Sequence, residues 1–375
     1  TIVDMYFINN YVQYKDAMES LGYIFPSMFI VMGITFGLGS GGTALIAQFI
    51  GADDKEKASN AAEHLIVLGI IIGIIFTVLF SLIAEELILL QGADFNALKH
   101  ALDYFYIIIF GTVFMILGIF FRSILSGEGD NIFAMKVIGG GTLLNIILDP
   151  ILIHFYQIKG AALATVISQI IIFFIFIYSI LIKKSFYLKL RFREFTYNKS
   201  IMNKIIELGL PASLSMVVMA LWMFICNKLI DDGDAVEAFA MAGRIEHFFF
   251  LIIISIATGL VTLVGMFFGA RRFDLIKEIV NYAIVRSITI GILFCIIFYL
   301  FKDYMFLPFK LEEGELEHIK NYFTIVPFAY PFIAVAMNSG RTMQALGYGM
   351  PTLILTFLRV LFINVLLSYI FIEIY

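Results

Sequence analysis

Long apolar stretches recur along the whole chain and alternate with short polar segments. Each stretch approaches or exceeds the roughly 20 residues that a helix needs to cross the hydrocarbon of a bilayer. The pattern predicts ten membrane-spanning helices, at 21–50, 62–84, 101–126, 132–154, 159–183, 205–230, 236–269, 278–301, 318–346 and 352–374. Residues 1–10 are typical of the end of a further helix. We therefore expect an all-α, multi-pass membrane protein.

The composition supports a membrane protein and excludes one class of partner. Hydrophobic residues make up 61% of the 375 residues and charged residues 14%, whereas soluble domains are about 45–50% apolar and 25% charged. The net charge of −4, without a basic tract outside the loops, argues against nucleic acid as a partner. The chain begins without Met and ends inside an apolar run, so we expect that it lacks both ends of a longer protein.

Basic residues in the short loops predict the orientation of the chain in the membrane. By the parity of the spans, most of them fall on one side: Lys55, Lys57, Lys183, Lys184, Lys189, Arg191, Arg193, Lys199, Lys204, Arg271, Arg272 and Lys277. The opposite loops carry the acidic segments 231–234 and 312–315. Because positively charged loops remain inside, the basic side is expected to be cytoplasmic, in the plasma or inner membrane of a cell.

A carboxylate inside a predicted span is the first candidate for chemistry. Asp149 follows Asn145 by four residues in the apolar run 137–153, and this spacing places both side chains on one helix face. An ionisable side chain in a span costs at least about 2.5–3.5 kcal/mol and by default marks an ion or substrate pathway. Pro150 lacks an N–H, which frees a carbonyl oxygen upstream. The segment therefore predicts an oxygen-rich pocket.

Two further polar residues are expected at the depth of Asp149. Asp4, Asp149 and Thr165 each lie about five to seven residues from the outer end of their spans, or roughly 8–10 Å below the surface. Together with Asn145 they form a candidate site for a cation or a proton. Two carboxylates in one low-dielectric pocket disfavour joint ionisation, so one should hold a proton or accept a cation. Alternatively, Asp4 and Asp149 are separate water-facing or helix-capping groups.

The chain also repeats itself. Three pairs of equivalent positions carry the repeat: Arg122 and Arg341, Asn145 and Asn364, both 219 apart, and Gly51 and Gly269, 218 apart. Both copies keep the same in–out sense, and parallel repeats around a central cavity are a design of secondary transporters. At the offset of 219, Asp149 corresponds to Ser368, so the acidic function is expected in the first half only.

These motifs bring a family into view. The segments that carry the resemblance are 37–58, Arg122 with Gly127-Glu-Gly-Asp, Asn145 with Leu-Asp149-Pro150, Gly160-Ala-Ala-Leu-Ala-Thr165, Gly209-Leu-Pro211 and Ala242-Gly-Arg244-Ile-Glu246. They resemble the multidrug and toxic compound extrusion (MATE) transporters almost from end to end. The resemblance implies two six-helix bundles, so that of twelve helices the first is partial and the twelfth absent here. It also implies export of drugs or metabolites, organic cations among them, driven by inward Na⁺ or H⁺.

The resemblance further suggests how the chain is organised. We expect an N-terminal bundle at 1–183, a cytoplasmic linker at 184–204 and a C-terminal bundle at 205–375. In the prokaryotic branch with a site in the first lobe, the family's ion-binding positions match Asp4, Asn145, Asp149 and Thr165. Another branch uses acids in the seventh and tenth helices, a mechanism that we disfavour because 320–346 contains none.

Several residues of the second half leave alternatives open. Arg244, Glu246 and His247 could gate or protonate something in that half, but we favour an internal ion pair that holds helices together. Most Phe, Met and Tyr residues are expected to face lipid or to pack between helices, and nothing in the sequence singles out a substrate contact. As residues lining a substrate cavity we select Met216, Met219, Phe224 and Met241.

Three classes of function are open to a membrane protein of this kind. An exporter accounts for the repeat, the buried acids and the motifs together. The alternative is a lipid-linked oligosaccharide flippase of related architecture, although such a protein would more often place several basic residues in its cavity, and the spans show no such cluster. No histidine occurs in a His-Glu-x-x-His pattern or beside an evident nucleophile. We therefore expect no enzyme and no cofactor, with membrane lipid and a small-molecule substrate as partners and Na⁺ or H⁺ as coupling ion.

Overall fold

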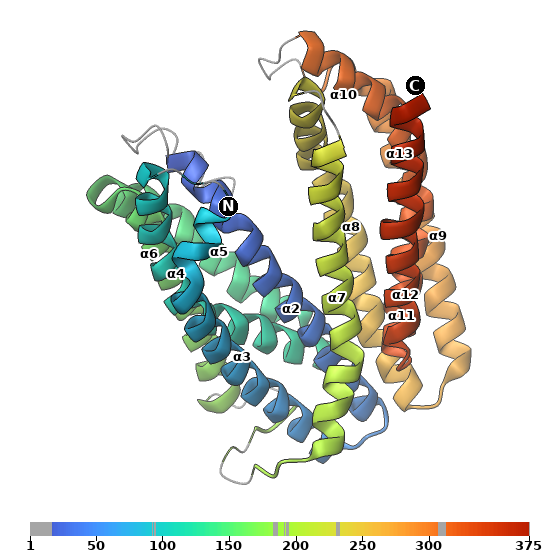
Figure 1. The fold of residues 1–375 in the computed structure, drawn as a ribbon. Coiled ribbons are helices and arrows are strands. Elements are labelled where there is room, and N and C mark those ends of the chain that lie inside the picture. Colours follow the sequence, from blue (N-terminus) through green and yellow to red (C-terminus); the bar gives the residue numbers. More distant parts are fainter. Residues whose placement is uncertain are drawn as a thin grey trace. The chain divides into compact units, whose positions relative to one another are not determined.

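The computed structural model describes residues 17–91, 93, 95–182, 187–190, 192, 195–229, 233–306 and 313–374. In these ranges every regular element is a helix (Figure 1). The α-helices are α2 (Ala17–Gly51), α3 (Lys55–Leu89), α4 (Phe95–Glu128), α5 (Asn131–Tyr156), α6 (Ile158–Ile177), α7 (Lys199–Leu229), α8 (Gly233–Gly269), α9 (Phe273–Phe301), α10 (Glu313–Ile325), α11 (Tyr330–Ala345), α12 (Gly349–Phe357) and α13 (Val365–Ile374). Shorter helical segments are η1 (Tyr178–Ile182), η3 (Val326–Ala329) and η4 (Leu358–Asn364).

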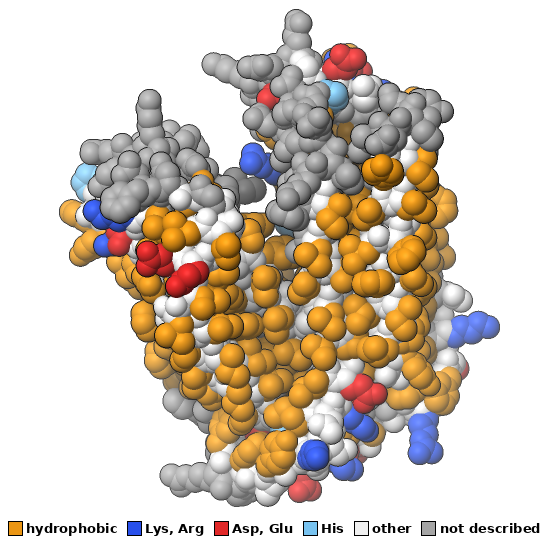
Figure 2. All heavy atoms as spheres, viewed as in Figure 1, with side chains coloured by type: hydrophobic (Ala, Val, Ile, Leu, Met, Phe, Trp, Pro, Cys, Tyr) orange, Lys and Arg blue, Asp and Glu red, His pale blue; other side chains and the backbone are white. Residues whose placement is uncertain are grey.

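The predicted membrane spans are confirmed. Within the described ranges, ten helices are long and apolar enough to cross a membrane. Figure 2 shows the visible face covered by hydrophobic side chains, with charged side chains mostly near the helix ends, as a lipid environment requires. Several helices exceed the expected spans. α2 and α3 each contain 35 residues, which is about 52 Å at 1.5 Å per residue and longer than a hydrocarbon core of roughly 30 Å.

Two of the predicted spans are interrupted. The span expected at 318–346 consists of α10 and α11 with the 3₁₀ turn η3 between them. Pro327 and Pro331 lie at this break, and because a proline has no N–H to donate, the α-helical ladder cannot continue unchanged through it. The span expected at 352–374 contains the π-helical segment η4. Apolar length alone, from which both spans were predicted, carries no information about either interruption.

The chain packs as two compact units. The first comprises residues 1–46 and 54–213, and the second residues 47–53 and 214–375. α2 and α7 therefore each contribute residues to both units. These packing units do not coincide with a division at the 184–204 linker, and the bundle boundaries expected from the sequence stay a prediction.

In the first unit, glycines bring α2 against α7. A Cβ atom at Gly37 would strike the backbone of Ser213, and one at Gly41 would strike the backbone of Gly209. The Ser213 hydroxyl donates a hydrogen bond to the Ile34 carbonyl at 3.0 Å. Small residues spaced by four thus allow the two backbones to approach closely, which is how membrane helices gain packing energy where lipid is as apolar as the side chains.

The segment before α7 is held on the start of α3 by a buried histidine. The Asn198 N–H donates to His64 Nε2 at 2.8 Å, while His64 Nδ1 lies 2.8 Å from the Asn60 carbonyl. Because that carbonyl can only accept and Nε2 accepts from Asn198, these hydrogen bonds assign the ring proton to Nδ1. The rings of Phe195 and Tyr197 pack on His64 with centroids 4.9 and 5.5 Å away.

Backbone landmarks confirm the two parallel repeats and set their spacing at 218 residues. α3 and α9 begin 218 apart (273 − 55), and so do α5 and α12 (349 − 131). The same spacing relates the residues with positive φ, which are Asp53 and Arg271, and Gly129 and Gly347. Helix contacts repeat as well, since Gly73 packs on Val113 and Gly291 on Pro331.

The offset of 219 between Asn145 and Asn364 has a local cause. A π-helical segment holds one residue more than the α-helix it replaces, and η4 ends at Asn364. Asn364 is therefore shifted by one residue from the repeat that begins at Gly349.

Candidate cation site in the first unit

The candidate residues of α5 share one buried face. Gly141, Asn145 and Asp149 recur every four residues and are buried, together with Ala134, Val137 and Ile153. Residues on the other faces, such as Leu143 and Ile147, are 63% and 60% exposed. The helix continues through Pro150. The polar pair therefore points into the unit, where a carboxylate needs compensation.

Asn145 and Asp149 contact each other as their spacing predicts. The Asn145 side-chain amide donates from Nδ2 to Asp149 Oδ1 at 3.3 Å. The exposed fraction is 6% for Asn145 and 0% for Asp149. With its NH₂ group directed at the carboxylate, Asn145 keeps its carbonyl oxygen as an acceptor for a guest. The pair thus offers oxygen ligands only.

α6 contributes two hydroxyl groups that lack hydrogen-bond partners. Among the residues that the structure describes, Thr165 Oγ1 and Ser168 Oγ are buried and make no hydrogen bond. Other hydroxyls in these helices donate to the carbonyl four residues earlier, as Thr112 and Thr142 do at 3.0 Å. A buried hydroxyl without a partner costs about 1–3 kcal/mol. Such a group is kept more readily where a ligand completes its bonding.

The antiparallel pairing of α5 and α6 places these groups at one level. The helices approach closely where Gly160 meets Leu152 and where Gly141 meets Ile172. Asp149 lies eight residues before Gln157, which joins the two helices, and Thr165 lies eight residues after it. Each is thus about 12 Å along its helix from the turn.

The four predicted ion-binding residues therefore have different outcomes. Asn145 and Asp149 are in direct contact, and Thr165 is on the facing helix at the level of Asp149. Asp4 lies outside the described residues. Ser168 was missed, although its spacing of three from Thr165 places both on one face of α6. The convergence of all four residues on one ion stays a prediction.

The predicted cavity residues lie in the second unit. Met216 on α7 is half-buried and Met219 is 48% exposed. Met241 on α8 packs against the aromatic core of that unit. The side chain of Phe224 lies outside the described part of the structure. Whether these side chains line a substrate cavity stays a prediction.

The ion pair favoured for the second half is wrong. Glu246 is buried, but its carboxylate accepts hydrogen bonds from Tyr322 and Tyr330. Arg244 and His247 are exposed on other faces of α8. Three neighbouring charges in the sequence suggested a pair, but on a helix adjacent positions point in different directions, so only one of the three enters the core.

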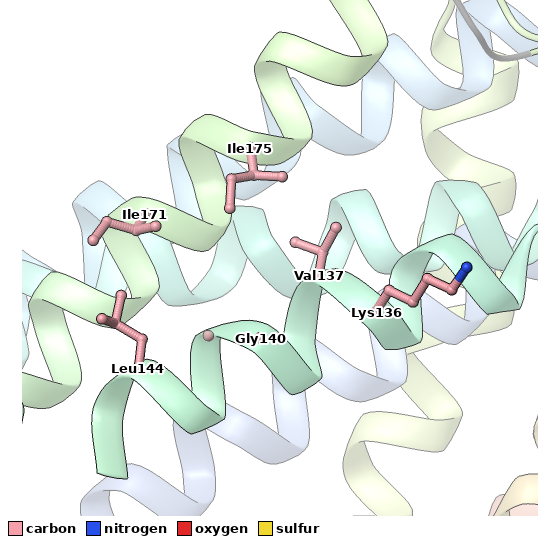
Figure 3. A pocket seen from close by; sticks show the side chains of 7 residues that line it. Lys136, Val137, Gly140, Leu144, Ile171 and Ile175 are labelled. Atoms are coloured by element: carbon pink, nitrogen blue, oxygen red, sulfur yellow. The ribbon is translucent and has the colours of Figure 1, made fainter. Parts of the chain in front are cut away.

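A groove on the surface of α5 and α6 lacks the chemistry of an ion site. Figure 3 shows it with its lining residues, Lys136, Val137, Gly140, Gly141, Leu144, Ile171 and Ile175. Its volume is about 410 Å³. Lys136 supplies the single charged side chain of the lining, and it is a cation. The oxygen ligands of Asn145 and Asp149 are not part of this lining, so we place no cation there.

Buried polar groups inside apolar helices, in a chain built from two parallel repeats, define a multi-pass membrane transporter. The chain belongs to the MatE family, whose model matches residues 1–151 and 208–370. It is 24% identical to the probable multidrug resistance protein YoeA of Bacillus subtilis over 345 residues, which cover 88% of this chain and 74% of the relative. It is 22% identical to an FAD transporter of Shewanella oneidensis over 371 residues, 96% of this chain and 80% of the relative.

A solved structure agrees with the fold. The crystal structure of the MATE P26A mutant matches all of this chain and 84% of its own, with a TM-score of 0.95 and 27% identity. The expected fold class, an all-α membrane protein of the MATE type, is therefore confirmed. These named relatives are transporters or resistance proteins, which places this chain among transporters.

Proposed function

We propose that the protein exports small organic compounds and that inward movement of Na⁺ or H⁺ through the α5–α6 site drives the export. The resemblance to YoeA supports a drug-like substrate, and the resemblance to an FAD transporter supports a metabolite. Organic cations are one class of such compounds.

One observation carries this proposal. Asp149 is fully buried beside Asn145, and the facing helix carries the Thr165 hydroxyl at the level of Asp149 and the Ser168 hydroxyl about 4.5 Å further along. A carboxylate at this depth is costly when ionised and uncompensated. A proton or a cation bound there removes much of that cost, so the free energy of the site depends on its occupancy.

This dependence can couple ion movement to export. A ligand shifts a conformational equilibrium only by the difference in its affinity for the two conformations. An ion that needs oxygens from both α5 and α6 favours the conformation in which these helices are close. The donor set of carboxylate, amide and hydroxyl oxygens suits a hard cation such as Na⁺, and Asp149 alone suffices for H⁺.

The test is export from proteoliposomes with the two ion gradients imposed separately. Ethidium, a fluorescent organic cation, serves as the probe substrate. One series applies a Na⁺ gradient at equal pH on both sides, and the other a pH gradient without Na⁺. We expect one of the two gradients to drive export by the wild-type protein.

Asp149→Asn keeps the size of the side chain and removes its charge. We expect this variant to fold and insert but to lose ion-driven export. Asp103→Asn is the matched control, because Asp103 is a partly exposed carboxylate that pairs with Lys159 at 3.0 Å. Export by the Asp149 variant at the wild-type rate, with the same ion dependence, would show that the site is structural.

A further inference from the structure

Glu246 is a buried carboxylate in the second unit. It lies on α8 with 7% of its surface exposed, in a core formed by Ala238, Ala242, Phe249, Ile253, Phe298, Phe306, Ile319, Phe323, Tyr330 and Ala334. The ring of Phe249 stacks on Tyr330 with centroids 4.5 Å apart. This core offers an ionised group little solvation.

Each carboxylate oxygen of Glu246 accepts one hydrogen bond. The Tyr330 hydroxyl donates to Oε1 at 2.7 Å, and the Tyr322 hydroxyl donates to Oε2 at 3.0 Å. α8 packs against α9, α10 and α11, and the titratable groups that these helices direct toward the cluster are Cys295, Tyr322 and Tyr330.

No positive charge compensates Glu246 within the described residues. Basic groups on neighbouring helices have other partners: Lys302 donates to Thr324 at 2.6 Å, and Lys320 pairs with Asp303 at 3.3 Å. A buried carboxylate without a countercharge is costly, and two hydroxyl donors offset only part of that cost. Hard metal cations require more oxygen ligands than the one carboxylate and two phenols found here. The ligand that fits is a proton.

The two tyrosines lie on opposite sides of the helix break. Tyr322 belongs to α10 and Tyr330 begins α11, with η3 and its Pro327 between them. An ionised carboxylate accepts from both tyrosines and so ties both segments to α8. In the protonated acid the hydroxyl oxygen accepts more weakly than a carboxylate oxygen and its own O–H needs an acceptor, so the tyrosine contact on that oxygen is weakened or reversed.

We propose that Glu246, Tyr322 and Tyr330 form a second proton-binding site, and that protonation of Glu246 loosens the break between α10 and α11. The proposal is independent of the α5–α6 site, because it holds whichever ion drives export there.

Infrared difference spectra between acidic and alkaline pH test proton binding directly. The purified protein in lipid is used without substrate. We expect the C=O band of a buried, protonated carboxylic acid to appear on acidification in Asp149→Asn, a background without the buried acid of the α5–α6 site, and to be lost when Glu246→Gln is added. The band should shift in Tyr330→Phe, which removes one hydroxyl partner. Glu317→Gln, which removes an exposed carboxylate on α10, should keep the band unchanged.

Hydrogen exchange at one pH tests the consequence. Gln at position 246 mimics the protonated acid, because its amide keeps one acceptor and gains donors. We therefore expect faster exchange in Glu246→Gln than in wild type at residues 325–331 and no change in Glu317→Gln.

Two results would overturn the proposal. One is an acid band that persists when Glu246→Gln is added to Asp149→Asn, and the other is a Glu246 carboxylate that stays ionised over the whole pH range, which would make the cluster a structural tie. If Glu246→Gln does not fold, Tyr322→Phe and Tyr330→Phe decide the question, since an unshifted band in both would exclude Glu246 as its source.

Discussion

Replacing Thr165 by Val removes one buried hydroxyl and keeps the shape of the side chain. Thr165 Oγ1 has no hydrogen-bond partner among the described residues, and such a group costs about 1–3 kcal/mol. In the absence of a coupling ion, the variant should therefore unfold with a free energy higher by up to about that amount. Thr142→Val is the matched control, because Thr142 already donates to the Ile138 carbonyl, and surface changes of this kind stay within about 0.5 kcal/mol.

The response to the ion should change in the opposite direction. An ion present at 100 times its dissociation constant stabilises the protein by about 2.7 kcal/mol. If the Thr165 hydroxyl is a ligand and its loss weakens binding about tenfold, about 1.4 kcal/mol of that stabilisation disappears. The variant is thus expected to be more stable than wild type without the ion and to gain less from it.

Thermal unfolding of the purified protein measures both quantities. Na⁺ is titrated at fixed pH in one series, and pH is varied without Na⁺ in the other. Wild type, Thr165→Val and Thr142→Val are compared at identical heating rates, because unfolding of membrane proteins is often irreversible. A Thr165 variant that is less stable without the ion, and that gains as much from it as wild type, would refute the assignment of this hydroxyl as a ligand.

Two further predictions concern the packing of each unit. Gly269→Ala should lower the free energy of unfolding by about 1–3 kcal/mol, because its Cβ would strike the Gln48 carbonyl. Gly259→Ala, with open space around it, should instead raise the free energy of unfolding by about 0.5–1 kcal/mol. Chemical denaturation measures both, and equal effects of the two substitutions would contradict this prediction. His64→Phe keeps an aromatic ring but leaves the Asn198 N–H without its acceptor, which costs about 1–3 kcal/mol. The variant should therefore be cleaved faster by a protease within residues 195–198. Unchanged cleavage would show that the histidine does not hold this segment.

The membrane spans could be predicted because length and apolar content decide them. Helix interruptions could not, since they depend on local backbone chemistry that apolar length does not describe. Pro327 and Pro331 were visible in the sequence, but a proline within a span is compatible with a kink, a 3₁₀ turn or a continuous helix. Pro150 illustrates the last case, because α5 continues through it.

The candidate site shows the same limit. The contact between Asn145 and Asp149 is local, so the spacing of four was sufficient to predict it. Glu246 instead bonds to tyrosines that are 76 and 84 residues away. Charge proximity along the chain suggested an ion pair for Glu246, and nothing in one sequence identifies two distant hydroxyls as its partners.

The two buried acids also show what the repeat does and does not share. Past the extra residue of η4 the spacing is 219, so Asp149 corresponds to Ser368, and at the spacing of 218 Glu246 corresponds to Met28. The halves therefore share turns, helix starts and glycine contacts, which determine the packing of each, but not the titratable groups. Under the two proposals, each acid acts on a different helix pair, and a charge change in one half need not be matched in the other. Each proposed site still needs its own difference in affinity between two conformations, because a ligand that binds both equally does not shift the equilibrium between them.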